Sequence, residues 1–146
     1  MVTYKKTKTL TPETAAYIAG LIDGEGTVTL SRRHANENRQ LVVSIANTER
    51  PLLEFVLTEV GVGKITRKRT ARSHHTPSFA YAVSNRQALD LLQQLGPHLR
   101  SYKRLRTDLV LCSYERLTPR NGKYSDAQIR LRRQFEANFL AITARE

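Results

Sequence analysis

The spacing of apolar residues changes along this chain from a helical period to a strand period, and the change occurs twice. A helical segment that begins at Thr11 is followed by two segments in which apolar and polar residues alternate. The same succession of one helix and two strands begins again at Pro51. Because a helix repeats about every 3.6 residues and a strand repeats every second residue, the pattern predicts an αββ unit that is used twice.

Further apolar stripes after the second pair of strands predict additional helices, with Leu99, Leu105, Leu109 and Cys112 in one and Leu131, Phe135, Phe139 and Ile142 in the last. Thr11 and Pro12 are typical of a helix start, Gly61 of a helix end and Ser125 of a helix cap. We predict helices at about 11–22, 51–60, 89–95, 99–117 and 125–142, and strands at about 27–34, 39–47, 64–70 and 79–84. The predicted fold class is α+β, with the order αββαββ followed by one or two helices, and with one four-stranded antiparallel sheet backed by helices.

Length and cysteine content limit the kind of protein this is. A chain of 146 residues is long enough for one domain with its own core. Its one cysteine, Cys112, lies in an apolar helical stretch, where it is predicted to fill the core, and the lack of a second favours an intracellular protein. No run of about 18 apolar residues predicts a membrane span or a signal peptide. We expect a single soluble domain over residues 1–146, located in a cytoplasm, nucleoid or organelle matrix.

The charge balance favours a polyanionic partner. Lysine and arginine number 24 against 13 acids, which gives a formal net charge of +11. The excess is concentrated in two segments, KITRKRTAR at 64–72 and RSYKRLR at 100–106. Nucleic acid is the first candidate partner, and an ordinary solvated basic surface is the alternative.

The predicted strands have one polar face that suits DNA. Their alternation directs Val28, Leu30, Leu41, Val43 and Ile45 inward. The opposite face presents hydrogen-bonding and basic side chains of the kinds that contact base edges and phosphates, namely Ser31, Arg33, Gln40, Ser44, Lys64, Thr66 and Lys68. The pattern alone is equally compatible with a solvated sheet face.

Residues 17–26, YIAGLIDGEG, end the first predicted helix with two carboxylates and three glycines. Asp23 and Glu25 are expected just past the helix C-terminus, where the helix dipole disfavours negative charge unless a cation compensates it. Carboxylates of this kind suit Mg²⁺. The alternative is a glycine-rich turn whose acids are merely solvated.

Residues 18–26, IAGLIDGEG, resemble the nine-residue signature of the LAGLIDADG homing endonuclease family at A-G-L-I-D and at the final acid and glycine. The predicted αββαββ order is similar to that family's fold, so the resemblance extends over nearly the whole chain. It implies that Glu25 and the Gly24 carbonyl bind the metal, with Glu in place of the second Asp of the signature. It also implies catalytic roles for Asn47 and for Lys103, with Tyr102 and Arg104 as the alternatives to the latter.

The signature occurs once, and the resemblance then implies a homodimer in which two motif helices pack together. Small side chains on that helix favour close approach, and the expected dimer interface contains Ala16, Ala19, Gly20 and Asp23. Each subunit would supply one acid. The implied cofactor is Mg²⁺, for which Ca²⁺ or Mn²⁺ substitutes in vitro. The implied partner is double-stranded DNA, with no membrane and no protein cofactor.

The expected function is site-specific cleavage of both DNA strands at a long palindromic or pseudo-palindromic target by metal-dependent phosphodiester hydrolysis. The alternative of a different class is a non-cleaving DNA-binding protein or an RNA-splicing maturase of the same fold. A basic structural or ribosome-associated protein would fit the charge but would leave IAGLIDGEG unexplained. The sequence identifies neither the target nor a host element such as an intron.

Several residues keep open interpretations. His74 and His75 fit loop residues near DNA phosphates better than zinc ligands, because no cysteine or third ligand lies at zinc spacing. His34 and His98 are isolated and receive no role. The alternation in the fourth predicted strand leaves open whether Tyr81 faces DNA or the core.

Overall fold

The computed structural model describes residues 4–68, 76–119 and 123–145. Its elements follow the predicted order, and the αββαββ pattern with trailing helices is confirmed. The bounds are α1 Pro12–Glu25, β1 Gly26–Ser31, β2 Gln40–Asn47, α2 Arg50–Val60, β3 Lys64–Lys68, β4 Ser78–Ser84, α3 Asn85–Leu95, the 3-10 turn η1 Gly96–His98, α4 Tyr102–Ser113 and α5 Asp126–Ala141.

Local sequence signals define several of these ends as predicted. The Thr11 side chain accepts a hydrogen bond from the Thr14 backbone N–H and caps α1. Gly61 adopts a left-handed conformation, φ 82°, that ends α2. Ser125 and Gln128 form a reciprocal capping box at the start of α5. These ends therefore follow from short-range chemistry.

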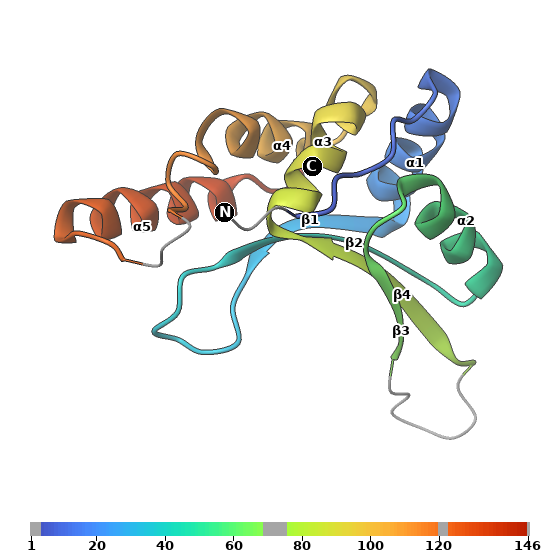
Figure 1. Cartoon of the computed structure of the whole chain (residues 1–146), viewed down its shortest axis with the longest axis horizontal. Coiled ribbons are helices and arrows are strands. Elements are labelled where there is room, and N and C mark those ends of the chain that lie inside the picture. Colours follow the sequence, from blue (N-terminus) through green and yellow to red (C-terminus); the bar gives the residue numbers. More distant parts are fainter. Residues whose placement is uncertain (1–3, 69–75, 120–122, 146) are drawn as a thin grey trace.

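The four strands form one antiparallel sheet in the order β1-β2-β4-β3. Figure 1 shows the described helices on one face of this sheet and none of them on the other. The β1–β2 loop and the far ends of β3 and β4 bend away from the helices, so the open face is concave. The predicted α+β class, with a four-stranded sheet backed by helices, is confirmed.

The core lies between the sheet and the helices, and the strand residues predicted to face inward are buried there. Tyr81 belongs to this core: it is fully buried and its hydroxyl donates to the Val62 carbonyl at 2.7 Å. The buried core residues of the strands, α1, α2 and α3 include Val28, Leu30, Leu41, Val43, Ile45, Ile18, Ile22, Leu53, Val56, Leu91 and Leu92. The open face is thereby left to polar and small side chains.

The predicted apolar stripes of the last two helices are wrong at several positions. Leu105 in α4 and Leu131 in α5 are exposed, and Cys112 is exposed rather than a core residue. The buried positions include Lys103 and Arg132 instead. Both basic side chains have hydrogen-bond partners elsewhere in the chain, so their burial is compensated and the buried face of each helix is rotated. Within the described residues, no helix has the length and hydrophobicity that crossing a bilayer requires.

Candidate active site and nucleic-acid interface

The last turn of α1 contains both acidic residues of the signature. The sequence predicted a helix end near Ile22 with the acids beyond it, but α1 continues through Glu25 and Gly26 caps it by donating its N–H to the Ile22 carbonyl. A Cβ at position 26 would lie 2.7 Å from the Ile22 Cα and 2.9 Å from the Ser44 carbonyl oxygen. Only glycine therefore lets the chain leave α1 so close to β2.

A lysine side chain supplies the cation at this helix end. The Lys103 ammonium donates to the Ile22 and Asp23 carbonyl oxygens at 2.7 and 3.0 Å. Burial lowers the pKa of Lys103, while the neighbouring Asp23 charge acts in the opposite direction. The helix dipole is compensated within the chain, so the placement of the acids does not by itself require a metal. This corrects the electrostatic argument made from the sequence.

Asp23 holds the start of α4. Its carboxylate accepts from the backbone N–H groups of Arg100 and Ser101 at 2.9 and 3.1 Å, and from the Ser101 hydroxyl. Burial raises the pKa of Asp23, but these hydrogen bonds and the charge of Lys103 outweigh burial, and the net pKa lies below its ordinary value. The carboxylate is therefore engaged within its own chain. Its predicted place in a dimer interface stays a prediction.

Glu25 points to the surface and contacts β2. The Asn47 side-chain amide donates to a Glu25 carboxylate oxygen at 2.6 Å, and the Asn47 side-chain oxygen accepts from the Glu49 N–H at 2.8 Å. The second contact fixes which side of the amide faces Glu25. The structure thus brings Glu25, Asn47 and Lys103 to one end of α1, although 78 positions separate Glu25 from Lys103 in the sequence. Their catalytic roles remain predictions.

The small residues of α1 divide between two faces. Ala19 is fully buried in the core of its own chain, which contradicts its predicted place on a partner-facing side. Ala16, Gly20 and Gly24 are exposed, and a Cβ at either glycine would meet no atom within 4 Å. Tyr17 lies beside them and is exposed, with its ring edge-on to Phe55 of α2. The exposed stripe is therefore narrower than predicted and keeps its small side chains.

The strand register places the predicted DNA-contacting side chains on the open face. Ser31 pairs with Gln40, and Ser44 and Lys64 both pair with Ala82, from opposite sides of β4. Arg33 lies in the β1–β2 loop, because β1 ends at Ser31 rather than near His34. A groove of about 600 Å³ on this face is lined by Ser31, Arg32, Arg33, Glu37, Asn38, Gln40, Val42, Lys64, Ala82 and Ser84. Thr66 and Lys68 continue the same face of β3.

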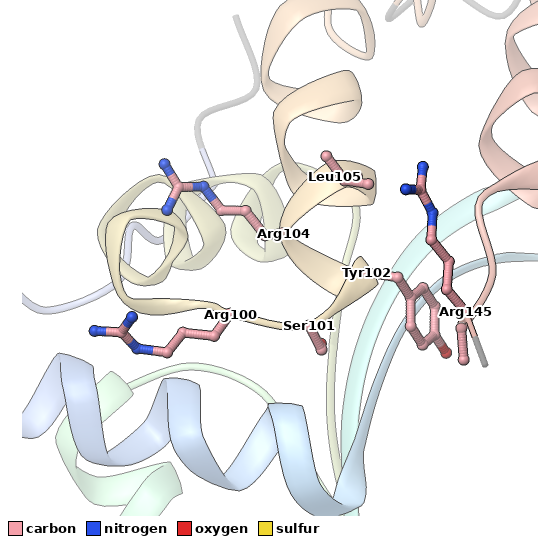
Figure 2. Close-up of a pocket in the computed structure, with 7 residues that line it drawn as sticks. Arg100, Ser101, Tyr102, Arg104, Leu105 and Arg145 are labelled. Atoms are coloured by element: carbon pink, nitrogen blue, oxygen red, sulfur yellow. The ribbon is translucent and has the colours of Figure 1, made fainter.

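A second hollow, of about 500 Å³, opens beside the start of α4 (Figure 2). Arg100 and Arg104 come from the basic segment RSYKRLR, and Arg145 reaches it from the C-terminal segment next to Tyr102. The sequence had marked the first two by charge clustering. A lone arginine near the end of the chain gives no such signal, so only the fold associates Arg145 with this group. These three arginines add positive charge at the start of α4, the helix that also contains Lys103.

With this geometry established, comparison with known proteins identifies the family. A family model described as a LAGLIDADG-like domain matches residues 12–96, which is more than half of the chain. The chain belongs to the LAGLIDADG-like domain family. The resemblance drawn from IAGLIDGEG is confirmed. A comparison with characterised proteins by sequence finds no match.

Solved structures share the fold of this LAGLIDADG-like chain at low sequence identity. The homing endonuclease I-CvuI, in complex with its target in 2 mM Ca, has a TM-score of 0.73 at 17% identity and covers 92% of this chain and 85% of its own. The archaeal intron-encoded I-Vdi141I, complexed with DNA, gives 0.61 at 14%, covering 92% and 86%. The LAGLIDADG meganuclease I-AabMI, bound to uncleaved DNA, gives 0.58 at 24%, covering 84% and 43%.

The described residues of this LAGLIDADG-like chain contain no complete set of side-chain metal ligands. Among the described residues, no group of three or more His, Cys, Asp or Glu side chains is placed to hold a metal ion. Glu25 offers a single exposed carboxylate, which matches the one or two carboxylates by which Mg²⁺ is usually bound. His34 lies in the β1–β2 loop and His98 in η1, while His74 and His75 lie outside the described residues.

The Asp23 contacts predict an acid-dependent stability difference. Asp23→Asn replaces an ionised acceptor and is expected to lower the free energy of unfolding near pH 7 by about 1–2 kcal/mol. Because the folded pKa of Asp23 lies below the ordinary 3.8, its stabilisation is present above that pH and is lost as the pH falls through the folded pKa. Urea unfolding of both proteins from about pH 7 to pH 2.5 measures the difference. A difference that stays constant over this range would contradict the assignment.

Proposed function

We propose that this chain is a site-specific, metal-dependent DNA endonuclease that acts as a homodimer. The observation that carries the proposal is the convergence of Glu25, Asn47 and Lys103 at the end of α1, next to an open basic sheet face. A domain that only bound DNA would need the sheet face alone. The signature acid is oriented by an amide and lies in the helix turn whose carbonyl groups a buried ammonium binds, and cleavage explains this arrangement.

The sheet face supports double-stranded DNA as the substrate. Its concave shape and its register gather Arg33, Gln40 and Lys64 around one groove. Arginine and lysine suit guanine edges or phosphates, and Gln40 suits an adenine edge. The homing endonucleases I-CvuI and I-Vdi141I share the fold and were solved with DNA, which agrees with this use of the face.

Divalent metal use is proposed from Glu25 and the adjoining Gly24 carbonyl. When bound, Mg²⁺ would supply Lewis-acid stabilisation and an activated water. The chain's own contribution is to orient the carboxylate through Asn47 and to hold the last turn of α1 through Lys103. The Lys103 ammonium also adds positive potential beside the expected position of the scissile phosphate, where charge develops in the transition state. The Ca present with I-CvuI is consistent with a divalent ion in this fold.

A second copy of the chain completes the proposed site. One chain offers one signature acid, and the exposed stripe of Ala16, Gly20 and Gly24 leaves room for a partner helix at close range. The chain covers 43% of I-AabMI, a meganuclease solved with DNA, whose chain is therefore long enough for two units of this size. It covers 85% of I-CvuI, whose chain therefore corresponds to one such unit. A two-fold dimer presents the sheet face twice and favours a palindromic or pseudo-palindromic target.

Glu25→Gln tests the chemical role directly. The change removes the charge of the proposed metal ligand and keeps its shape, so the single-turnover cleavage rate in Mg²⁺ should fall at least about hundredfold. The DNA dissociation constant in Ca²⁺ should change less than about threefold. Glu13→Gln, in the first turn of the same helix, is the matched control and should cleave normally. A Glu25→Gln variant that cuts at the wild-type rate would refute the assignment, and a wild-type protein that binds but never cuts would favour the non-cleaving or maturase alternative.

Gly20→Leu tests the dimer without disturbing the core. Because position 20 opens onto empty space, the larger side chain should leave the monomer folded while preventing close approach of a second α1. Sedimentation should show a dimeric wild type and a monomeric, inactive variant. Ala137→Leu adds the same kind of bulk on the exposed side of α5 and should remain dimeric. An active wild-type monomer would exclude the two-fold arrangement.

A further inference from the structure

Arg132 is a fully buried basic residue that the proposed chemistry does not use. It lies in α5, and its side chain is 1% exposed. Its guanidinium pairs with Glu136 at 3.1 Å and lies over the rings of Tyr114 and Phe135, 4.9 and 5.5 Å from their centroids. A buried ion pair of this kind is often no more stabilising than apolar residues of similar volume. What it provides instead is a fixed arrangement of the segments that it joins.

The Arg132 guanidinium joins α5 to two other segments. One nitrogen donates to the Leu117 carbonyl at 3.2 Å and to the Thr118 hydroxyl, both in the connection that follows α4. The other terminal nitrogen donates to the carbonyl of Arg39, which directly precedes β2. The helical layer thus reaches the base of the β1–β2 hairpin through one side chain.

Arg39 makes three further contacts, two with Glu136 and one with Leu30. Its backbone N–H donates to the Glu136 carboxylate at 3.3 Å, and its side chain lies 3.7 Å from the other Glu136 oxygen. The Arg39 guanidinium also donates to the Leu30 carbonyl across the hairpin at 3.4 Å. Both backbone polar groups of this residue are therefore bound to α5.

Tyr114 binds the backbone of Leu41, which lies in β2 two residues after Arg39. Its hydroxyl accepts from the Leu41 backbone N–H at 3.2 Å and donates to the Asn85 side chain at 3.0 Å. Gln40, between Arg39 and Leu41, is exposed on the open face beside its pairing partner Ser31. The backbone on both sides of Gln40 is thus bound to buried side chains of the helical layer.

We infer that Arg132, Glu136 and Tyr114 are positioning residues that set the geometry of base recognition by Gln40 and the adjoining hairpin. The inference rests on the proposed function. A bidentate contact to a base edge tolerates little displacement, because both hydrogen bonds must form together. The contacts to the backbone of Arg39 and Leu41 hold Gln40 in place from the helical side of the sheet, so its side chain can keep a fixed position on the open face.

The test is selection of bound sequences from a randomised DNA library with the full-length protein in Ca²⁺. Tyr114→Phe keeps the ring and removes only the hydroxyl, so it should fold. It should lose discrimination, by about tenfold, at the base positions that Gln40→Ala also relaxes. The positions that Lys64→Ala relaxes should be unchanged. Arg132→Lys keeps a positive charge but not the fork, and it should affect the same positions as Tyr114→Phe.

Two controls separate positioning from stability. Val56→Ala truncates the core under α2, away from the hairpin, and should leave the position-by-position profile intact. The double variant Gln40→Ala/Tyr114→Phe should discriminate no worse than Gln40→Ala. The inference would be overturned if Tyr114→Phe lost discrimination uniformly at all base positions, or if the losses of the two single variants added in the double variant. Either result would give Tyr114 a merely structural role. If Gln40→Ala did not alter the sequence preference of the wild type, the inference would fail and the proposed function would stand. If the wild type had no sequence preference, both would fail.

Discussion

The contact between the last turn of α1 and the start of α4 determines where the signature acid lies. Lys103 donates to two carbonyl oxygens at the negative end of α1, and Asp23 accepts from two backbone N–H groups and a hydroxyl at the positive end of α4. Each charge therefore meets the helix end of opposite sign. Hydrogen bonds to charged groups contribute about 1.5–3 kcal/mol each, so this exchange outweighs the unfavourable placement of acids at a helix C-terminus. Glu25 then projects from a turn that is fixed from two directions.

Much of the fold follows from local pattern and could be predicted. The alternation in β1 and β2 gave the buried face, and hydrogen-bonding caps such as Ser125 gave helix ends. The faces of α4 and α5 could not be predicted in the same way. A hydrophobicity pattern favours Leu105 and Cys112 over Lys103 for burial, because it contains no information about the two carbonyl groups, 81 and 80 residues away, that accept from that lysine. The buried Arg132 was missed for the same reason.

The sequence could predict which residues meet at the end of α1, but not the contacts that each of them makes. The resemblance selected Glu25, Asn47 and Lys103, and the structure brings them together. The resemblance could not show that the Asp23 carboxylate binds the backbone at the start of α4. Nor could it separate Ala19, which faces the core, from the exposed small residues of the same helix, because both sets repeat at helical spacing. Two polar networks, one at the end of α1 and one around the buried Arg132, fix the last turn of α1 and the backbone on both sides of Gln40, at a cost in desolvation.

The proposed function requires two copies of this chain to bring their Glu25 carboxylates to one DNA target. The most direct test is a crystal structure of the protein with a palindromic duplex selected by the wild type, grown in Ca²⁺. We expect two chains per duplex, α1 helices in contact along Ala16, Gly20 and Gly24, and each Glu25 carboxylate about 2.3–2.6 Å from a Ca²⁺ that also contacts a backbone phosphate. One chain per duplex, or Glu25 carboxylates remote from both cation and phosphate, would contradict it.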